Sequence, residues 1–328
     1  MQRGALEWNW EDAGRCAVCA LPAALVILTG DADKGLAWAI GILPAAMVGM
    51  APRRRDRTKL VLIGLLFAAS IMIGSVLSKA AVLAVVGIFF VAYGSALLAS
   101  RAVFGQVAMM LCAPVAAIGL SYSQLDKAFG LGVLMLAGSI WSCAVFLLWA
   151  DRPPAAASAR PPLLPTAVAR RYGVLLGLAA ASSAAVAEAI HTDHVGWATA
   201  AALFVMRPKR EMQQLRSIGR VVSVFVGALA AVAFVRGAPP LAAVAAAAIV
   251  AIAGMGATRQ SRWYVGPLFT TFLVLTLLLY SDATKAEAQW RFNERVGETI
   301  LGVAFAYFYG LVVADLLDRF ESRRVSPK

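Results

Sequence analysis

Charged residues are scarce in this chain. Only 15% of its 328 residues carry a charge, whereas a soluble globular domain averages about 25%. Histidine and cysteine are also rare, at two and four residues. No glycine-rich loop ending in Lys-Ser or Lys-Thr occurs, so the sequence predicts no ATPase site. With 61% hydrophobic residues, the composition points away from a soluble enzyme and towards a membrane protein.

The four cysteines form neither a disulfide framework nor a metal-binding pattern. Cys16 and Cys19 form a Cys-x-x-Cys motif at the start of an apolar run, with no second pair or histidine nearby. Cys112 and Cys143 lie in other apolar runs. We therefore expect all four to pack as small apolar side chains, and we expect no cofactor.

The net charge of +12 is distributed over alternate loops. If the N-terminus is cytoplasmic, 23 of the 30 lysines and arginines fall in inside loops, as the positive-inside rule requires. A crossing missed early in the chain would exchange the sides of every later loop. The distribution predicts cytoplasmic N- and C-termini in a bacterial inner membrane. It argues against nucleic-acid binding, which needs the basic residues on one soluble face.

The apolar runs between these loops predict an all-α integral membrane protein. A helix needs about 20 apolar residues to cross the hydrocarbon core, or fewer where neighbouring helices shield its ends. We expect about twelve transmembrane helices. They correspond to residues 16–29, 35–51, 60–78, 80–99, 103–122, 129–150, 172–190, 195–206, 221–235, 241–257, 263–280 and 296–316.

A segment rich in proline and arginine, residues 151–171, divides the chain into residues 1–150 and 172–328. We expect a cytoplasmic linker there, with six crossings on each side. An even number of crossings gives both halves the same orientation, so the prediction is two parallel six-helix repeats. Trp38 and Trp197 support duplication, because each lies in the second crossing of its half at an offset of 159 residues.

The second crossing is irregular in both halves. Residues 195–206 are short for a membrane span, and residues 35–51 are interrupted by Gly41, Pro44 and Gly49. Short or broken segments at matching places in two halves indicate the binding site of a transporter. The alternative is that these helices are tilted or extended by neighbouring polar turns.

A Trp-led apolar helix, a proline, a basic loop and two arginines four residues apart follow one another within residues 193–221. This pattern resembles the fusaric acid resistance and aromatic acid exporter family. Residues 295–302 resemble the closing helix of that family's repeat. Two features depart from the family: Ser223 and Val224 stand where Gly-Thr is expected, and the chain shows no counterpart of the large cytoplasmic domains of many relatives.

The resemblance implies export of small organic acids, often aromatic, driven by the proton gradient. It also implies a periplasmic adaptor of the membrane-fusion type as a partner in some systems. A homo-oligomer is a further expectation that the sequence leaves open.

Several acidic residues and histidines are candidates for proton coupling. A charge inside a membrane has a high free-energy cost, so a charged residue there is commonly functional. The candidates are Glu188, His191, Asp193, His194 and Glu298. Glu188 lies about one turn from the outer end of its helix, so it either carries a proton or is an interfacial carboxylate that reaches water. The histidine pair either accepts protons or belongs to an ordinary polar loop. With one obvious carboxylate beside the histidines, we expect no metal site.

Aromatic and basic residues are candidates for binding an organic anion. They are Trp38, Trp197, Arg216, Arg220 and Arg295. The alternative for the tryptophans is a role as interface anchors. The alternative for Arg216 and Arg220 is that they set the topology by contacting anionic lipid.

These features predict a secondary transporter, not an enzyme, that exports small organic anions with protons. Three alternatives remain. The first is a passive anion channel on the same scaffold. The second is a major-facilitator transporter, whose usual Gly-x-x-x-Asp-x-x-Gly-Arg loop pattern is absent from residues 49–59. The third is a membrane enzyme or a membrane assembly subunit that transports nothing.

Overall fold

The computed structural model describes residues 6–151, 163–207, 210–261, 265–280 and 285–325, and all regular structure in these ranges is helical. Six helical stretches in this part of the chain are long and apolar enough to cross a membrane. They are Arg54–Leu77, Ala81–Ala99, Leu125–Leu147, Thr166–Ala189, Gln213–Arg236 and Gln289–Arg319. Four shorter apolar stretches are Phe104–Gly119, Val195–Val205, Leu241–Ala257 and Val265–Tyr280. The all-α membrane class is confirmed, while the number of crossings stays a prediction.

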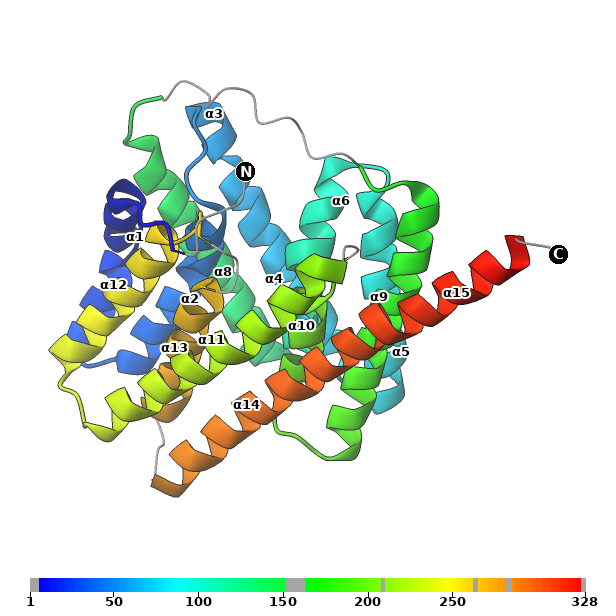
Figure 1. Cartoon of the computed structure of the whole chain (residues 1–328). Helices are drawn as coiled ribbons and strands as arrows, with labels where there is room; N and C mark the ends of the chain where they lie inside the picture. Colours follow the sequence, from blue (N-terminus) through cyan, green and yellow to red (C-terminus); the bar gives the residue numbers. More distant parts are fainter. Residues whose placement is uncertain (1–5, 152–162, 208–209, 262–264, 281–284, 326–328) are drawn as a thin grey trace. The chain divides into compact units, whose positions relative to one another are not determined.

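The helices follow one another along the chain as labelled in Figure 1. In order they are α1 (Trp10–Leu28), α2 (Ala32–Val48), α3 (Arg54–Arg57), α4 (Lys59–Leu77), α5 (Ala81–Ala99), α6 (Val103–Val107), the π-helical turn η1 (Ala108–Cys112), α7 (Ala113–Gly119), α8 (Leu125–Leu147), α9 (Thr166–Ala189), α10 (Val195–Val205), α11 (Arg210–Arg236), α12 (Leu241–Ala257), α13 (Val265–Tyr280), α14 (Lys285–Tyr307), the π-helical turn η2 (Phe308–Val313) and α15 (Ala314–Val325).

Several helices extend beyond the apolar runs from which they were predicted. The helix expected from residue 16 begins at Trp10, because the Asn9 side chain accepts hydrogen bonds from the N–H groups of Glu11 and Asp12 and so caps α1. By contrast, α12 has the predicted bounds. Hydropathy alone therefore found the apolar centres of helices and missed their polar first turns. Most of the predicted linker, residues 152–162, lies outside the described residues.

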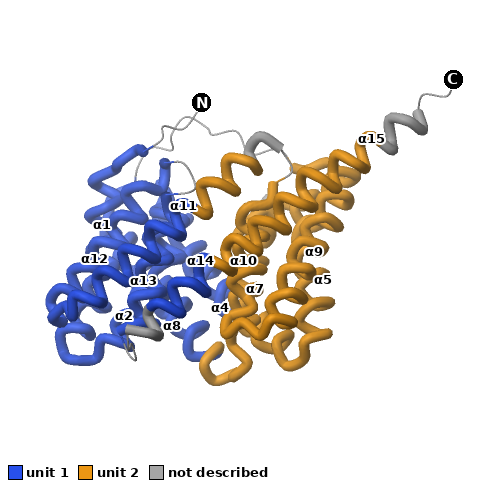
Figure 2. The backbone as a smooth tube through the Cα atoms, turned by 60° about the horizontal axis from the view of Figure 1, so that its bottom comes forward, with its two compact units in different colours: residues 1–69, 129–159, 222–296 blue, residues 70–128, 160–221, 297–328 orange. Residues whose placement is uncertain are grey.

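The chain divides into two compact units, shown in different colours in Figure 2. Unit 1 comprises residues 1–69, 129–159 and 222–296, and unit 2 comprises residues 70–128, 160–221 and 297–328. Each unit therefore takes helices from both sides of the predicted linker.

In unit 1, α2 is the central helix and packs against α1, α12 and α13. It approaches α8 closely as well, because Gly41 lies against the carbonyl of Leu134 and Gly138 lies against the carbonyl of Gly41. A side chain at Gly41 or Gly138 would collide with main chain. These glycines allow the two helices to pack backbone to backbone.

In unit 2, α9 packs against α5 and α10, and α10 packs against α7. Gly173 and Gly177 bring α9 close to α5, since they lie against Ala96 and Phe89. The core of this unit is built largely from alanine, with larger side chains such as Ile88, Leu176 and Leu203. Small residues at helix contacts are typical of membrane bundles, where close packing drives association.

Candidate functional site

The short helix α10 is the most completely buried helix of unit 2. It has 11 residues, which span about 16 Å, or roughly half of the hydrocarbon core. Every residue in it except Phe204 is buried. The segment predicted as the second crossing of the second half is therefore a short helix, as its sequence predicted, and it is almost completely buried.

The last turn of α10 has its carbonyl groups satisfied by buried side chains. The Arg207 Nη1 donates to the carbonyls of Met206 at 2.7 Å and Leu203 at 3.4 Å. The Tyr172 hydroxyl, from α9, donates to the same Met206 carbonyl at 3.0 Å. Because helix ends leave carbonyls without intrahelical partners, these contacts allow α10 to end inside the protein.

Arg216 and Arg220 lie in the first half of α11. Arg220 is only 6% exposed, and its guanidinium lies 5.0 Å from the centre of the Phe204 ring, a cation–π contact with α10. Arg216 is half-buried. A buried arginine can bind a carboxylate through two parallel hydrogen bonds, so Arg220 fits the predicted role in anion binding.

The other end of α10 carries both histidines of the chain. His191 is exposed and adopts a left-handed backbone conformation with φ of 52°. His194 is half-buried, and its ring stacks on Trp197 with centroids 4.1 Å apart and an interplanar angle of 12°. Asp193 is exposed. Of the predicted residues, His194 and Trp197 are thus brought into direct contact.

Three predicted acidic and basic residues differ in burial. Glu188, in the last turn of α9, is half-buried. Glu298 and Arg295, both in α14, are only 3% and 8% exposed. They are three residues apart on one helix and so share a face. Both lie in the candidate span Gln289–Arg319, which makes Glu298 the most deeply buried of the predicted proton carriers.

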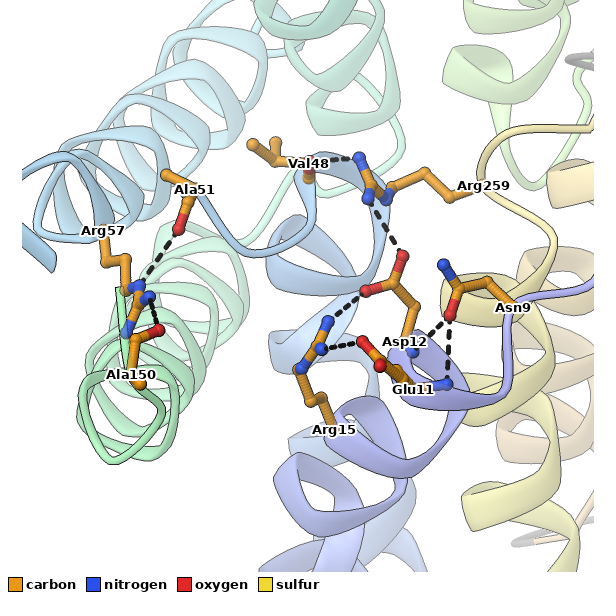
Figure 3. A network of polar contacts seen from close by, with 9 residues as sticks. All are labelled: Asn9, Glu11, Asp12, Arg15, Val48, Ala51, Arg57, Ala150 and Arg259. Atoms are coloured by element: carbon orange, nitrogen blue, oxygen red, sulfur yellow. Dashed lines mark hydrogen bonds and ion pairs between the residues drawn. The ribbon is translucent and has the colours of Figure 1, made fainter. Parts of the chain in front are cut away.

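An ionic network in unit 1 joins the start of α1 to the ends of α2 and α12 (Figure 3). Asp12 accepts from Arg15 at 2.6 Å and from Arg259 at 3.1 Å. Arg259 also donates to the Val48 carbonyl at 3.1 Å. The other Nη of Arg15 donates to Glu11 at 2.6 Å. The sequence did not predict this network, because its residues stand there only as charges between apolar runs.

Arg57 forms a second polar centre in unit 1, with its side chain fully buried. Figure 3 shows it between Ala51 and Ala150, whose carbonyls it contacts at 3.0 Å and 2.8 Å. It also donates to the carbonyls of Phe146 and Trp149, each at 2.7 Å. The guanidinium therefore caps the C-terminal end of α8 with its fixed fork of donors. In the sequence, Arg57 and Arg216 are 159 residues apart, the same offset as between Trp38 and Trp197.

Charged side chains near the starts of helices pair locally. Lys59, the first residue of α4, donates to Asp56 of α3 at 2.7 Å. Lys34, in the first turn of α2, donates to Asp31 at 2.6 Å, and this hydrogen bond lowers the pKa of the Asp31 carboxyl. These exposed pairs organise turns and carry no chemistry of their own.

Trp38, the counterpart of Trp197, lies in the central helix of unit 1 and is half-buried. Its indole Nε1 is buried and has no hydrogen-bond partner among the described residues. An indole N–H can only donate, so the group that would satisfy it is an acceptor. The role of Trp38 in substrate binding stays a prediction.

In the comparison with known proteins, one family model matches a segment that includes residues of both units. Residues 180–309 match the family model described as fusaric acid resistance protein-like. The matched segment includes α10, Arg220 and Glu298, and it confirms the predicted resemblance. No curated protein and no solved structure matches the chain.

Proposed function

We propose that this chain, which matches the fusaric acid resistance protein-like family model over residues 180–309, is a proton-coupled exporter of small organic acids in a bacterial inner membrane. The observation that carries the proposal is the burial of Glu298, 3% exposed within the candidate span Gln289–Arg319. Ionisable residues inside membrane helices commonly mark ion and proton pathways. Glu298 is the proton carrier in this account.

The position of Arg220 supports the proposal that the substrate is an anion. Its guanidinium is nearly inaccessible to water yet lies against the face of Phe204 in the central helix of unit 2. A cation held beside an aromatic ring in a low-dielectric setting suits a ligand that combines a carboxylate with an aromatic ring. Arg220 is therefore proposed to bind the carboxylate, and Arg216, one turn earlier, to attract it.

The pairing of helices within each unit supports two six-helix repeats. In unit 1, α1 packs against α2 and α12, and in unit 2, α9 packs against α10 and α5. If α1 corresponds to α9, α2 to α10 and α5 to α12, the same contacts occur twice. Each unit then combines the first two helices of one repeat with later helices of the other.

The test is efflux of labelled p-hydroxybenzoate from proteoliposomes, with and without a pH gradient and with protein-free vesicles as background. Efflux by the wild type should depend on the gradient, and Glu298→Gln should abolish that dependence. Glu294→Gln is the matched control, because Glu294 lies one turn away on α14 and pairs with Arg291 at 3.4 Å. Efflux by the wild type that does not depend on the pH gradient would favour a passive channel and contradict the coupled exporter.

A further inference from the structure

One buried hydroxyl in unit 2 lacks the partner that its neighbours have. Ser183, in α9, is 0% exposed, and its Oγ has no hydrogen-bond partner among the described residues. Serine inside a helix usually bonds to a carbonyl one turn earlier. Ser95 does so with Ala92 at 2.8 Å, and Ser217 does so with Gln213 at 3.0 Å. Four buried hydroxyls of unit 1, those of Ser139, Ser142, Thr271 and Thr276, also lack a partner among the described residues, so Ser183 is the exception within unit 2.

The face of α9 that carries Ser183 is turned towards α10. Ser183 follows Tyr172 by 11 residues, which is three turns plus about 20°, so the two share a face. The Tyr172 hydroxyl bonds to Met206 at the end of α10. Gly173 and Gly177, on another face, lie against α5 instead.

Ser183 is also level with the first turn of α10. The 11 residues from Tyr172 to Ser183 rise about 16 Å, and α10 has about the same length. The two helices are antiparallel, since the start of α9 contacts the end of α10. Starting from Met206, the same rise in the opposite direction along α10 leads to Val195.

The first turn of α10 is suited to an anion. Helix N-termini carry the positive end of the helix dipole and present N–H groups. The N-cap residue His194 makes no side-chain cap hydrogen bond. The Gly196 N–H already donates to the Ser121 hydroxyl at 3.0 Å and the Trp197 N–H to the His194 carbonyl at 2.9 Å, so the first turn attracts an anion through the helix dipole and not through these two groups. Glu188 does not oppose an anion here, because it lies about 140° around α9 from Ser183.

We propose that Ser183 and the first turn of α10 form a second carboxylate-binding position of the transporter, at the opposite end of α10 from Arg220. This inference rests on the proposed function, because it assigns a further position to the same substrate. The Ser183 hydroxyl donates to a carboxylate oxygen, and the helix N-terminus stabilises the negative charge. Since Ser183 is fully buried, the proposal requires that α9 and α10 move apart to admit the ligand.

The test is equilibrium binding of labelled benzoate to the purified full chain in detergent. Ser183→Ala should weaken binding about tenfold, as expected for a lost hydrogen bond to a charged group. Ser183→Thr should restore binding, because it keeps the hydroxyl. Ser95→Ala should leave binding unchanged, since that hydroxyl is already satisfied by its own helix. Benzamide, which has the same shape without the charge, should not compete.

The melting temperature separates a binding role from a structural one. Ser183→Ala should melt no lower than the wild type, because it removes a buried hydroxyl with no partner. Unchanged benzoate binding by Ser183→Ala, with binding by the wild type intact, would overturn this inference and leave the exporter standing. Absence of both binding and transport in the wild type would overturn the exporter and this inference together.

Discussion

Arg259 and Asp12 are 247 residues apart in sequence, yet the Arg259 Nη2 lies 3.1 Å from the Asp12 carboxylate. Asp12 is shared with Arg15, so one carboxylate holds two guanidinium groups. The contact joins the first turn of α1 to the turn after α12 in unit 1. It fixes helices from the two predicted halves of the chain to each other.

Asp12→Asn should destabilise the protein by about 2 kcal/mol, because it leaves the 4% exposed side chain of Arg15 with only Glu11 to balance it. The expected result is a melting temperature lower by about 5 °C in detergent. Glu11→Gln is the matched control: the Glu11 side chain is 65% exposed, so its pair with Arg15 should contribute about 0.5 kcal/mol. Equal losses in the two variants would contradict this assignment.

Arg57→Lys should also destabilise, although it keeps the charge. Lysine has a single ammonium and cannot reproduce the fork that contacts the carbonyls of Ala51, Phe146 and Ala150. We expect a loss of about 3 kcal/mol, since buried carbonyls at the end of α8 lose their donors. Arg55→Lys, at an exposed position of α3, should melt like the wild type. A stable Arg57→Lys protein would show that the caps are dispensable.

The two halves of the chain should depend on each other for folding. In unit 1, α1 packs against α12, and in unit 2, α5 packs against α9. Residues 1–156 and 157–328, expressed as separate chains, should each be degraded or aggregate alone. When they are co-expressed, a tag on one should recover the other as a monodisperse complex. A monodisperse, cooperatively melting half on its own would argue against helix exchange between the halves.

The sequence was sufficient to predict the helices but not their long-range partners. Apolar runs located α10 and α12 to within one residue, because hydropathy measures the lipid-facing and buried surface directly. The polar first turn of α1 was missed. Its Asp12 carboxylate pairs with Arg259 as well as with the nearby Arg15, and Arg259 lies far away in the chain and leaves no trace in local composition.

The candidate site was also predicted only in part, because some of its features depend on long-range packing that the sequence does not reveal. The short second crossing and its Trp197 pointed to α10, which the structure places at the centre of unit 2. Ser183 was not predicted, because a serine in an apolar helix ordinarily bonds to its own backbone. Only the structure shows that its hydroxyl lacks a partner among the described residues. The relative burial of Glu188 and Glu298 likewise needed the packing of the helices.

The most direct test of the central claim is proton movement driven by substrate. Proteoliposomes loaded with p-hydroxybenzoate and an internal pH-sensitive dye are diluted into substrate-free buffer. The account predicts that the interior of wild-type vesicles acidifies as substrate leaves, beyond the change in protein-free vesicles. Glu298→Gln should show no such acidification, while Glu294→Gln behaves like the wild type. Acidification by Glu298→Gln at the wild-type rate would contradict the assignment of Glu298 as the proton carrier.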